Sequence, residues 1–284
     1  MTGRIGFMQG RLCAQVGNEI QAFPWRDWEA EFPLASALGI RAMEWTLDHA
    51  RLYDNPLMTD DGRSRIRLLQ RKHRVAIPSL TGDCFMQSPF WKEEGADTRA
   101  ALKSDFLAIC EASSALGIRM LVVPIVDNGR IDSLDQEDEL VGFFLEHQAV
   151  LSKLGIRVAF ESDFPPAEVR RFIDRLPTGS FGINYDIGNS AALGYNPADE
   201  FAAYGDRVLN VHIKDRILGG STVPLGQGAA NFDVVFAEIA AANYTGNFIL
   251  QTARATDGDH SGAVYAYHQM AMKWIRKSRP GAMK

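Results

Sequence analysis

Residues 115–125 read ALGIRMLVVPI, and this stretch joins the end of a helix to a buried strand. Gly117 stands where helical periodicity gives way to the apolar run 119–125, and glycine at that position is typical of helix C-termini. A continuous apolar run of this kind is typical of a parallel strand that helices cover on both faces. The junction recurs as ALGIR at 37–41 and KLGIR at 153–157. The chain therefore repeats one helix–glycine–strand junction.

Outward from this junction, short β-rich runs alternate with longer amphipathic segments along the whole chain. Eight runs are expected to be strands: 4–8, 40–46, 74–80, 119–125, 156–161, 181–186, 208–214 and 247–252. Eight segments with helical periodicity are expected to be helices: 26–38, 60–73, 97–116, 133–154, 165–176, 196–205, 231–242 and 260–277. Units of about 35 residues predict an α/β fold, a closed (β/α)8 TIM barrel in a single domain spanning residues 1–284. No GxGxxG fingerprint follows the first strand, which argues against a Rossmann fold.

Composition narrows the function classes. Apolar residues make up 46% and charged residues 23% of the chain, as in an ordinary globular protein. The formal net charge of −5 disfavours nucleic acid as a partner. Three cysteines, at positions 13, 84 and 110, have no zinc-site spacing and an odd count, which favours a reducing compartment. Without a signal-peptide pattern or a long apolar run, we expect a cytoplasmic protein with no membrane partner.

Polar side chains stand at the ends of the last four predicted strands. They are Glu161, Asp186, His212 and Gln251, each about one strand–helix unit after the one before. In a barrel, the carboxyl ends of all strands meet at one mouth, so these side chains are expected to lie together. Two carboxylates, an imidazole and an amide oxygen suit Mn²⁺, Mg²⁺, Co²⁺ or Zn²⁺. The sequence therefore predicts one divalent metal ion at this mouth.

The same residues carry a family resemblance. YDIGN at 185–189 and NVHIKD at 210–215, with Glu161 ahead and Gln251 behind, resemble the sugar phosphate isomerase/epimerase family of xylose-isomerase-like TIM barrels. The likeness runs from GFMQGRL at 6–12 to the last helix. It implies a divalent metal held by the residues at positions 161, 186, 212 and 251. Two positions depart from the family pattern: the family has Glu at 251, and its epimerases often have His where Asn189 stands.

Gln251 bears on the type of reaction. Its carbonyl oxygen can still bind a metal, but the amide removes one negative charge and accepts no proton. Inverting a carbon atom needs two acid/base groups, whereas an aldose–ketose isomerisation can use one. The substitution therefore favours isomerisation, or dehydration by a single base, unless another acid such as Asp83 or Asp163 supplies the second group. The expected base is Glu161, which removes the proton beside a metal-polarised carbonyl.

Further residues are expected to bind the substrate. Lys214, Arg216 and Arg254 follow the last two predicted strands and are suited to an oxyanion. Asp83, Asn189 and Glu44 lie at other strand ends or just beyond them and are expected to line the pocket. The loop 81–91, TGDCFMQSPFW, is interpreted either as a lid or as a segment packed on its neighbours.

These observations favour a metal-dependent isomerase or epimerase acting through an enediolate on a small sugar, a sugar phosphate or a related polyol ketone. Two alternatives stay open: an inosose-type dehydratase that uses the same site, and a metal-free sugar-binding barrel. DNA repair by phosphodiester hydrolysis is disfavoured, because only one predicted strand ends in a histidine and the net charge is acidic. The expected partner is a small carbohydrate, and a homo-oligomer is possible.

Overall fold

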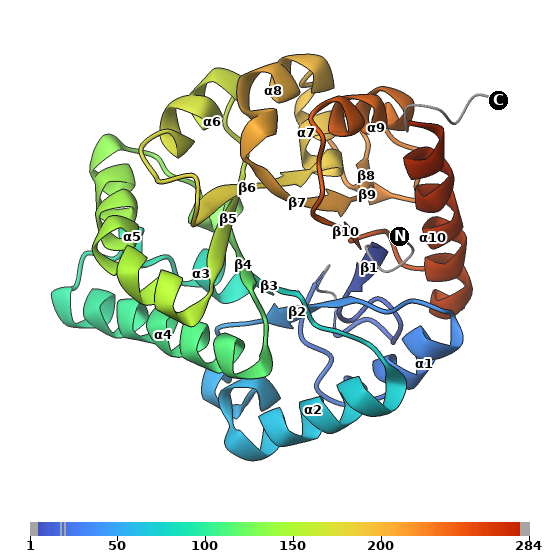
Figure 1. Cartoon of the computed structure of the whole chain (residues 1–284), viewed down its shortest axis with the longest axis horizontal. Coiled ribbons are helices and arrows are strands. Elements are labelled where there is room, and N and C mark those ends of the chain that lie inside the picture. Colours follow the sequence, from blue (N-terminus) through green and yellow to red (C-terminus); the bar gives the residue numbers. More distant parts are fainter. Residues whose placement is uncertain (1–4, 18, 20, 279–284) are drawn as a thin grey trace.

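The computed structural model describes residues 5–17, 19 and 21–278, so Arg4 of the predicted strand 4–8 and both ends of the predicted domain 1–284 lie outside the described residues. Eight parallel strands close into a barrel in the order β1-β10-β7-β6-β5-β4-β3-β2, as the sequence predicts (Figure 1). The strands are β1 Ile5–Met8, β2 Met43–Leu47, β3 Ser79–Gly82, β4 Met120–Ile125, β5 Arg157–Ser162, β6 Phe181–Asp186, β7 Val208–Ile213 and β10 Asn247–Leu250. A two-stranded antiparallel ribbon, β8 Asp215–Arg216 and β9 Thr222–Val223, follows β7.

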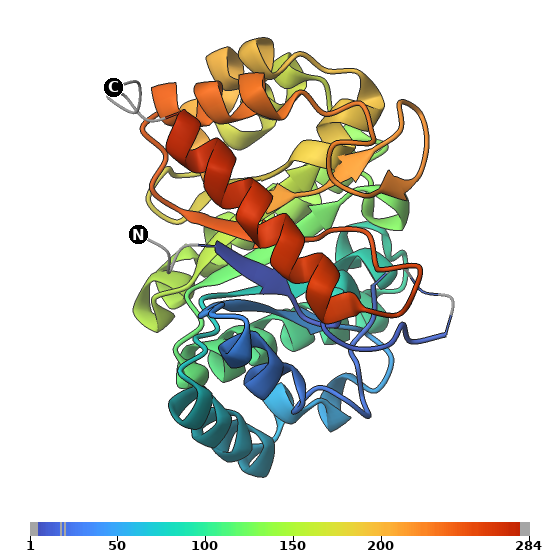
Figure 2. The same ribbon diagram turned by 90° about the vertical axis from the view of Figure 1, so that its right-hand side faces the viewer.

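Helices surround the barrel (Figure 1), and Figure 2 shows α10 lying across its side next to β1. They are α1 Glu31–Ala37, α2 Asp60–His73, α3 Asp83–Gln87, α4 Ala96–Leu116, α5 Leu134–Leu154, α6 Pro166–Ile173, α7 Ile187–Leu193, α8 Pro197–Tyr204, α9 Phe232–Ala241 and α10 His260–Lys277. Single 3-10 turns lie at Leu52–Asp54, Pro56–Met58, Phe90–Lys92, Asp127–Gly129 and Gly205–Arg207. Within the described part of the chain, no helix has the length and apolar character needed to cross a membrane.

The repeated junction works through the conformation of its glycine. Gly117 ends α4 with a φ of 82°, and Gly155 ends α5 with a φ of 68°. Both values lie in the left-handed region, which side chains with a Cβ disfavour. The chain can therefore leave each helix and enter the next strand within two or three residues.

The third strand begins later than predicted. The sequence predicts a strand over 74–80, but regular pairing starts at Ser79 and continues to Gly82. Before it, Ala76 makes only an isolated bridge to Ala42. Pro78 lacks the N–H group that a ladder needs, which explains why the regular strand starts after it.

Two short helices directly after strands were not predicted. α3 follows β3, and α7 follows β6, in segments that read as strand ends and loops. The Asp186 carboxylate accepts a hydrogen bond from the backbone N–H of Asn189 at 2.8 Å and so caps α7. The same side chain that belongs to the predicted site therefore also fixes the start of a helix.

The apolar core lies between the barrel and its helices. Phe143 and Phe144 of α5 pack against Phe106 of α4, and Phe144 also packs on Phe160 of β5. Because strand side chains alternate, the residues on either side of Phe160 point into the barrel instead. This alternation places Glu161, at the end of β5, on the inner face of the barrel.

The segment 81–91 packs on neighbouring elements. Phe85 contacts Phe106 of α4, and the Trp91 indole N–H donates to the Gly129 carbonyl at 3.0 Å. Phe85, Phe90 and Trp91 are all buried. Of the two interpretations of this segment, packing against neighbours fits these contacts.

Candidate active site

Three of the four predicted ligands meet inside the mouth of the barrel. One ligand atom from each of Glu161, Asp186 and His212 lies within 4.8 Å of the other two, and all three residues are buried. His212 Nδ1 is 3.2 Å from Glu161 Oε2 and 4.0 Å from Asp186 Oδ2. Neighbouring strands β5, β6 and β7 carry the three residues at their carboxyl ends. The set therefore fits a divalent cation by donor type and by proximity.

Glu44 lies beneath His212, in the interior of the barrel. Its Oε1 is 2.7 Å from His212 Nε2, and its carboxylate also accepts from Ser79 Oγ, Thr81 Oγ1 and Asn210 Nδ2 at 2.5, 2.6 and 3.0 Å. When Nε2 donates its proton to Glu44, the lone pair on Nδ1 faces Glu161 and Asp186. Glu44 was expected to line the substrate pocket, but its side chain is fully buried and contacts the imidazole.

The carboxylates around His212 attract positive charge. Burial alone would lower the pKa of His212, but the carboxylates of Glu44 and Glu161 outweigh it and raise that pKa to about 10. Metal binding at Nδ1 would require the loss of the Nδ1 proton, which the nearby carboxylates stabilise.

Two asparagines hold the Glu161 carboxylate from below and from the side. Asn184 Nδ2 donates to Oε2 at 2.7 Å, and Asn189 Nδ2 donates to Oε1 at 2.8 Å. Arg216 in turn donates to Asn189 Oδ1 at 2.9 Å and to the Gly220 carbonyl. Asn189 and Arg216, both predicted to bind substrate, therefore contact each other, and Asn189 also contacts the predicted base.

Gln251 and Lys214 lie together on the β7–β10 side of the mouth. Lys214 Nζ is 3.0 Å from Asp186 Oδ2 and 3.4 Å from Gln251 Oε1. Gln251 Nε2 donates in the opposite direction, to Gln21 Oε1, at 2.9 Å. The carbonyl oxygen of Gln251 thus faces the ammonium of Lys214, which lies between it and Asp186.

Asp83 and Arg254 both contact the segment that follows β1. The Asp83 carboxylate is buried and accepts from Gln21 Nε2 at 2.8 Å. Arg254 Nη1 donates to the Cys13 carbonyl at 2.6 Å. The three predicted oxyanion-binding cations are therefore divided, because Arg254 lies over the loop after β1 while Lys214 and Arg216 lie near Asp186 and Asn189.

Sequence reasoning missed several residues of the site. Asn184 and Asn210 precede Asp186 and His212 by two positions, so strand alternation could have placed them on the same inner face. Gln21 lies in the irregular segment between β1 and α1, where no periodic pattern indicates which way a side chain points.

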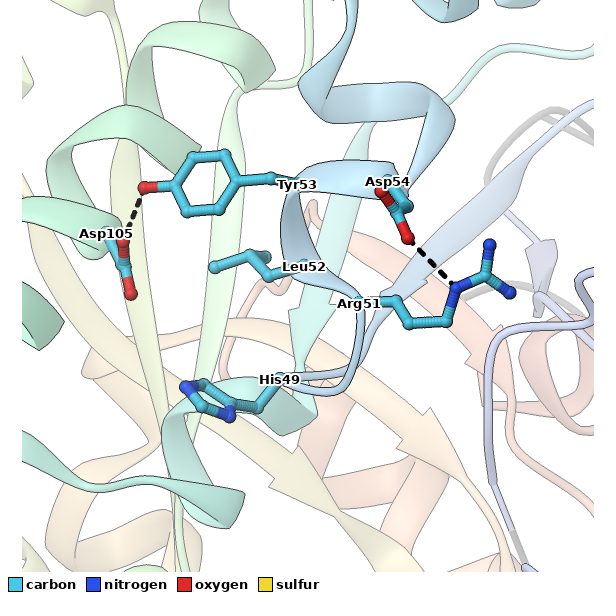
Figure 3. A pocket seen from close by; sticks show the side chains of 6 residues that line it. All are labelled: His49, Arg51, Leu52, Tyr53, Asp54 and Asp105. Carbon is cyan, nitrogen blue, oxygen red and sulfur yellow. Dashed lines mark hydrogen bonds and ion pairs between the residues drawn. The ribbon is translucent and has the colours of Figure 1, made fainter.

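A separate hollow of about 300 Å³ lies at the turn Leu52–Asp54, after β2 (Figure 3). It is open to solvent, contains none of the predicted site residues, and is lined by His49, Arg51, Leu52, Tyr53, Asp54 and Asp105. Four of its polar side chains pair with one another: Arg51 pairs with Asp54 at 3.0 Å, and the Tyr53 hydroxyl donates to Asp105. The chemistry that the sequence predicts therefore belongs to the carboxylate and imidazole cluster.

Comparison with known proteins places the chain in a family. The family model of the xylose isomerase-like TIM barrel matches residues 32–278. The relative named "Putative L-ribulose-5-phosphate 3-epimerase SgbU" of Haemophilus influenzae is 23% identical over 241 residues, covering 79% of this chain and 83% of that protein. An inosose dehydratase of Geobacillus kaustophilus is 25% identical over 126 residues, covering 38% of this chain and 40% of that protein.

Solved structures share the fold. A D-psicose 3-epimerase, crystallised in the presence of D-fructose, superposes with a TM-score of 0.74 at 14% identity, covering 96% of this chain and 99% of that one. The IOLI protein with a bound zinc atom superposes with a TM-score of 0.73 at 14% identity, covering 97% and 99%. Together with the family match over most of its length, the barrel shows that this chain belongs to the xylose isomerase-like TIM barrel family.

Proposed function

We propose that this chain is a divalent-metal-dependent isomerase or epimerase of a small sugar, a sugar phosphate or a related polyol ketone. The observation that carries the proposal is the buried set of Glu161, Asp186 and His212, whose ligand atoms lie within 4.8 Å of one another. Relatives named as sugar epimerases and a structural neighbour with bound zinc support it.

Glu161, Asp186 and His212 would hold the metal, and the carbonyl oxygen of Gln251 is the fourth candidate ligand. When bound, the metal supplies Lewis acidity that polarises the carbonyl and neighbouring hydroxyl of the substrate. Lys214 would compete with the metal for Asp186 and Gln251, because its ammonium contacts both side chains.

Glu161 would take the proton from the carbon between the two substrate oxygens. The electron pair of that C–H bond then forms the double bond of an enediolate, and the carboxylate later returns the proton. Asn184 and Asn189 hold the two oxygens of Glu161, so the base is oriented before the substrate binds. The Lys214 ammonium can donate a hydrogen bond to the oxygen on which negative charge develops.

A metal-supplemented screen tests this function. Mn²⁺, Co²⁺, Mg²⁺ or Zn²⁺ is added to the purified protein with ketoses, ketose phosphates and inososes in D₂O, and deuterium at carbon is measured. We expect one substrate class to gain deuterium in the presence of metal. Glu161→Gln should abolish this gain, whereas Glu94→Gln, at an exposed position, should leave it unchanged. Turnover by Glu161→Gln at the wild-type rate would contradict the role of Glu161.

A dehydratase is the second candidate. Two observations favour it: the neutral Gln251, which accepts no proton and so cannot serve as a second acid/base group, and the partial match to an inosose dehydratase. The same screen separates the two functions, because a dehydratase forms a product that has lost the mass of one water molecule.

A further inference from the structure

Two hydrogen bonds cross the mouth of the barrel and connect Gln251 to Asp83. Gln251 Nε2 donates to Gln21 Oε1 at 2.9 Å, and Gln21 Nε2 donates to Asp83 Oδ2 at 2.8 Å. A single carboxamide group therefore separates the neutral side chain at position 251 from a carboxylate. The acid that position 251 lacks is present one side chain further across the mouth.

The barrel places Asp83 across the mouth from the candidate ligand His212. In the order of the strands, β3 lies four positions from β7, which is directly opposite in an eight-stranded barrel. Asp83 follows β3, while His212 and Lys214 lie at the end of β7. Glu161 on β5 lies between these two sides. A substrate over the ligands would thus have Glu161 on one flank and Asp83 on another.

The surroundings of Asp83 favour a carboxyl group that both gains and loses a proton near neutral pH. Burial is the largest cause that raises its pKa to about 7, and the charges of Asp48 and Glu161 raise it further. The hydrogen bond from Gln21 and the charge of Arg11 act on the pKa in the opposite direction. General acid/base catalysis is most effective with such a value.

We propose that Asp83, two strands round the barrel from Glu161, is the second acid/base group of this site, and that the chain inverts a carbon beside the carbonyl of its substrate. This inference rests on the proposed function. Glu161 removes the proton from one face, and the C–H electron pair enters the enediolate. The Asp83 carboxyl group then donates its proton to the same carbon on the opposite face, forming the new C–H bond. Glu161 ends protonated and Asp83 ionised, and exchange of protons with solvent restores both.

Asp83→Asn tests the inference in D₂O, using the ketose or ketose phosphate that the wild-type protein turns over. The variant keeps Glu161, so the epimer whose hydrogen faces Glu161 should still gain deuterium while its inversion falls by at least about 100-fold. The opposite epimer should neither exchange nor invert. Asp83→Glu should recover part of the inversion, because it restores a proton carrier.

Asp97→Asn is the matched control. Asp97 is an exposed acid in the first turn of α4, so inversion should stay close to the wild-type rate. Undiminished inversion by Asp83→Asn would overturn the inference, as would an equal loss of exchange for both epimers with no recovery in Asp83→Glu. If the wild-type protein exchanges no substrate hydrogen at all, the proposed function fails instead.

Discussion

The tautomer and the orientation of the His212 ring depend on the residues that contact its two nitrogens. Its Nε2 meets Glu44 and its Nδ1 faces Glu161 and Asp186, so a single ring joins the interior of the barrel to the mouth. A ligand that is held at its second nitrogen keeps one tautomer and one orientation. Glu44 would therefore affect the affinity of the proposed metal site through His212.

Glu44→Gln is expected to weaken metal binding by about 10- to 100-fold, because the amide holds the imidazole less well than the carboxylate does. Calorimetric titration with Mn²⁺ and Zn²⁺ measures the change, and thermal unfolding of the same samples reports on folding. Ser79→Ala, which removes one donor to Glu44 but keeps the carboxylate, should have a smaller effect. Equal metal affinity in Glu44→Gln and wild type would refute the role of Glu44.

Lys214→Met is expected to strengthen metal binding roughly five- to tenfold, because it removes a like charge from the cluster, and two unit charges about 4 Å apart repel by on the order of 1 kcal/mol in a water-like medium. In the wild-type protein the Lys214 ammonium contacts Asp186 and Gln251, and so competes with the metal for both side chains. Turnover should fall in the same variant if Lys214 also binds the substrate. Lys277→Met, at an exposed ion pair on α10, serves as the control. Weaker metal binding in Lys214→Met would show that Lys214 supports the site.

At the scale of elements, α1 holds the loop after β1 through Glu31. The buried Glu31 carboxylate accepts from the backbone N–H of Gly10 at 2.8 and 2.9 Å and from that of Leu12 at 3.0 Å. Burial raises its pKa to about 7, although these hydrogen bonds lower it. The loop that this carboxylate anchors continues to Gln21, which contacts both Gln251 and Asp83.

The raised pKa of Glu31 predicts a pH dependence of stability. Because the folded-state pKa of about 7 exceeds the ordinary glutamate value of 4.5, the folded protein binds more protons than the unfolded chain between these values. The contribution of Glu31 to the free energy of unfolding should therefore decrease by about 3 kcal/mol as the pH rises from 4.5 to 7. Urea unfolding of wild type and Glu31→Gln from pH 5 to 8 measures it, with the variant expected to show the flatter profile. Parallel profiles would contradict the assignment.

At the scale of the whole molecule, eight parallel strands bring distant residues to one mouth, and the chain carries a net charge of −5. A surface of this charge does not attract a polyanion. The net charge therefore gives no overall attraction for a nucleic acid, and we expect none as a partner.

We expect no cleavage of abasic-site DNA by the protein with Mn²⁺ or Zn²⁺, measured on a fluorescently labelled duplex. The net acidic charge and the single histidine among the candidate ligands are the physical reasons. Cleavage that disappears in Glu161→Gln would contradict this expectation and assign the site to phosphodiester hydrolysis.

The sequence alone determined the barrel, the bounds of most helices and three residues of the cluster. Apolar periodicity and glycine junctions are local signals, so Gly117 and its repeats indicated where helices end. The carboxyl ends of parallel strands always share one edge, so the positions of Glu161, Asp186 and His212 in the chain were enough to group them.

Only the tertiary structure decided how these residues are connected. The contact between His212 and Glu44 joins positions 168 residues apart, and the contact between Gln251 and Gln21 joins positions 230 residues apart. Neither pair shares a strand, a helix or a repeat, so no local pattern records it. The placement of Lys214 between Asp186 and Gln251, and of Asp83 across the mouth, depends on barrel closure and on an irregular segment. Such contacts arise from packing in three dimensions, which periodicity in one dimension does not specify.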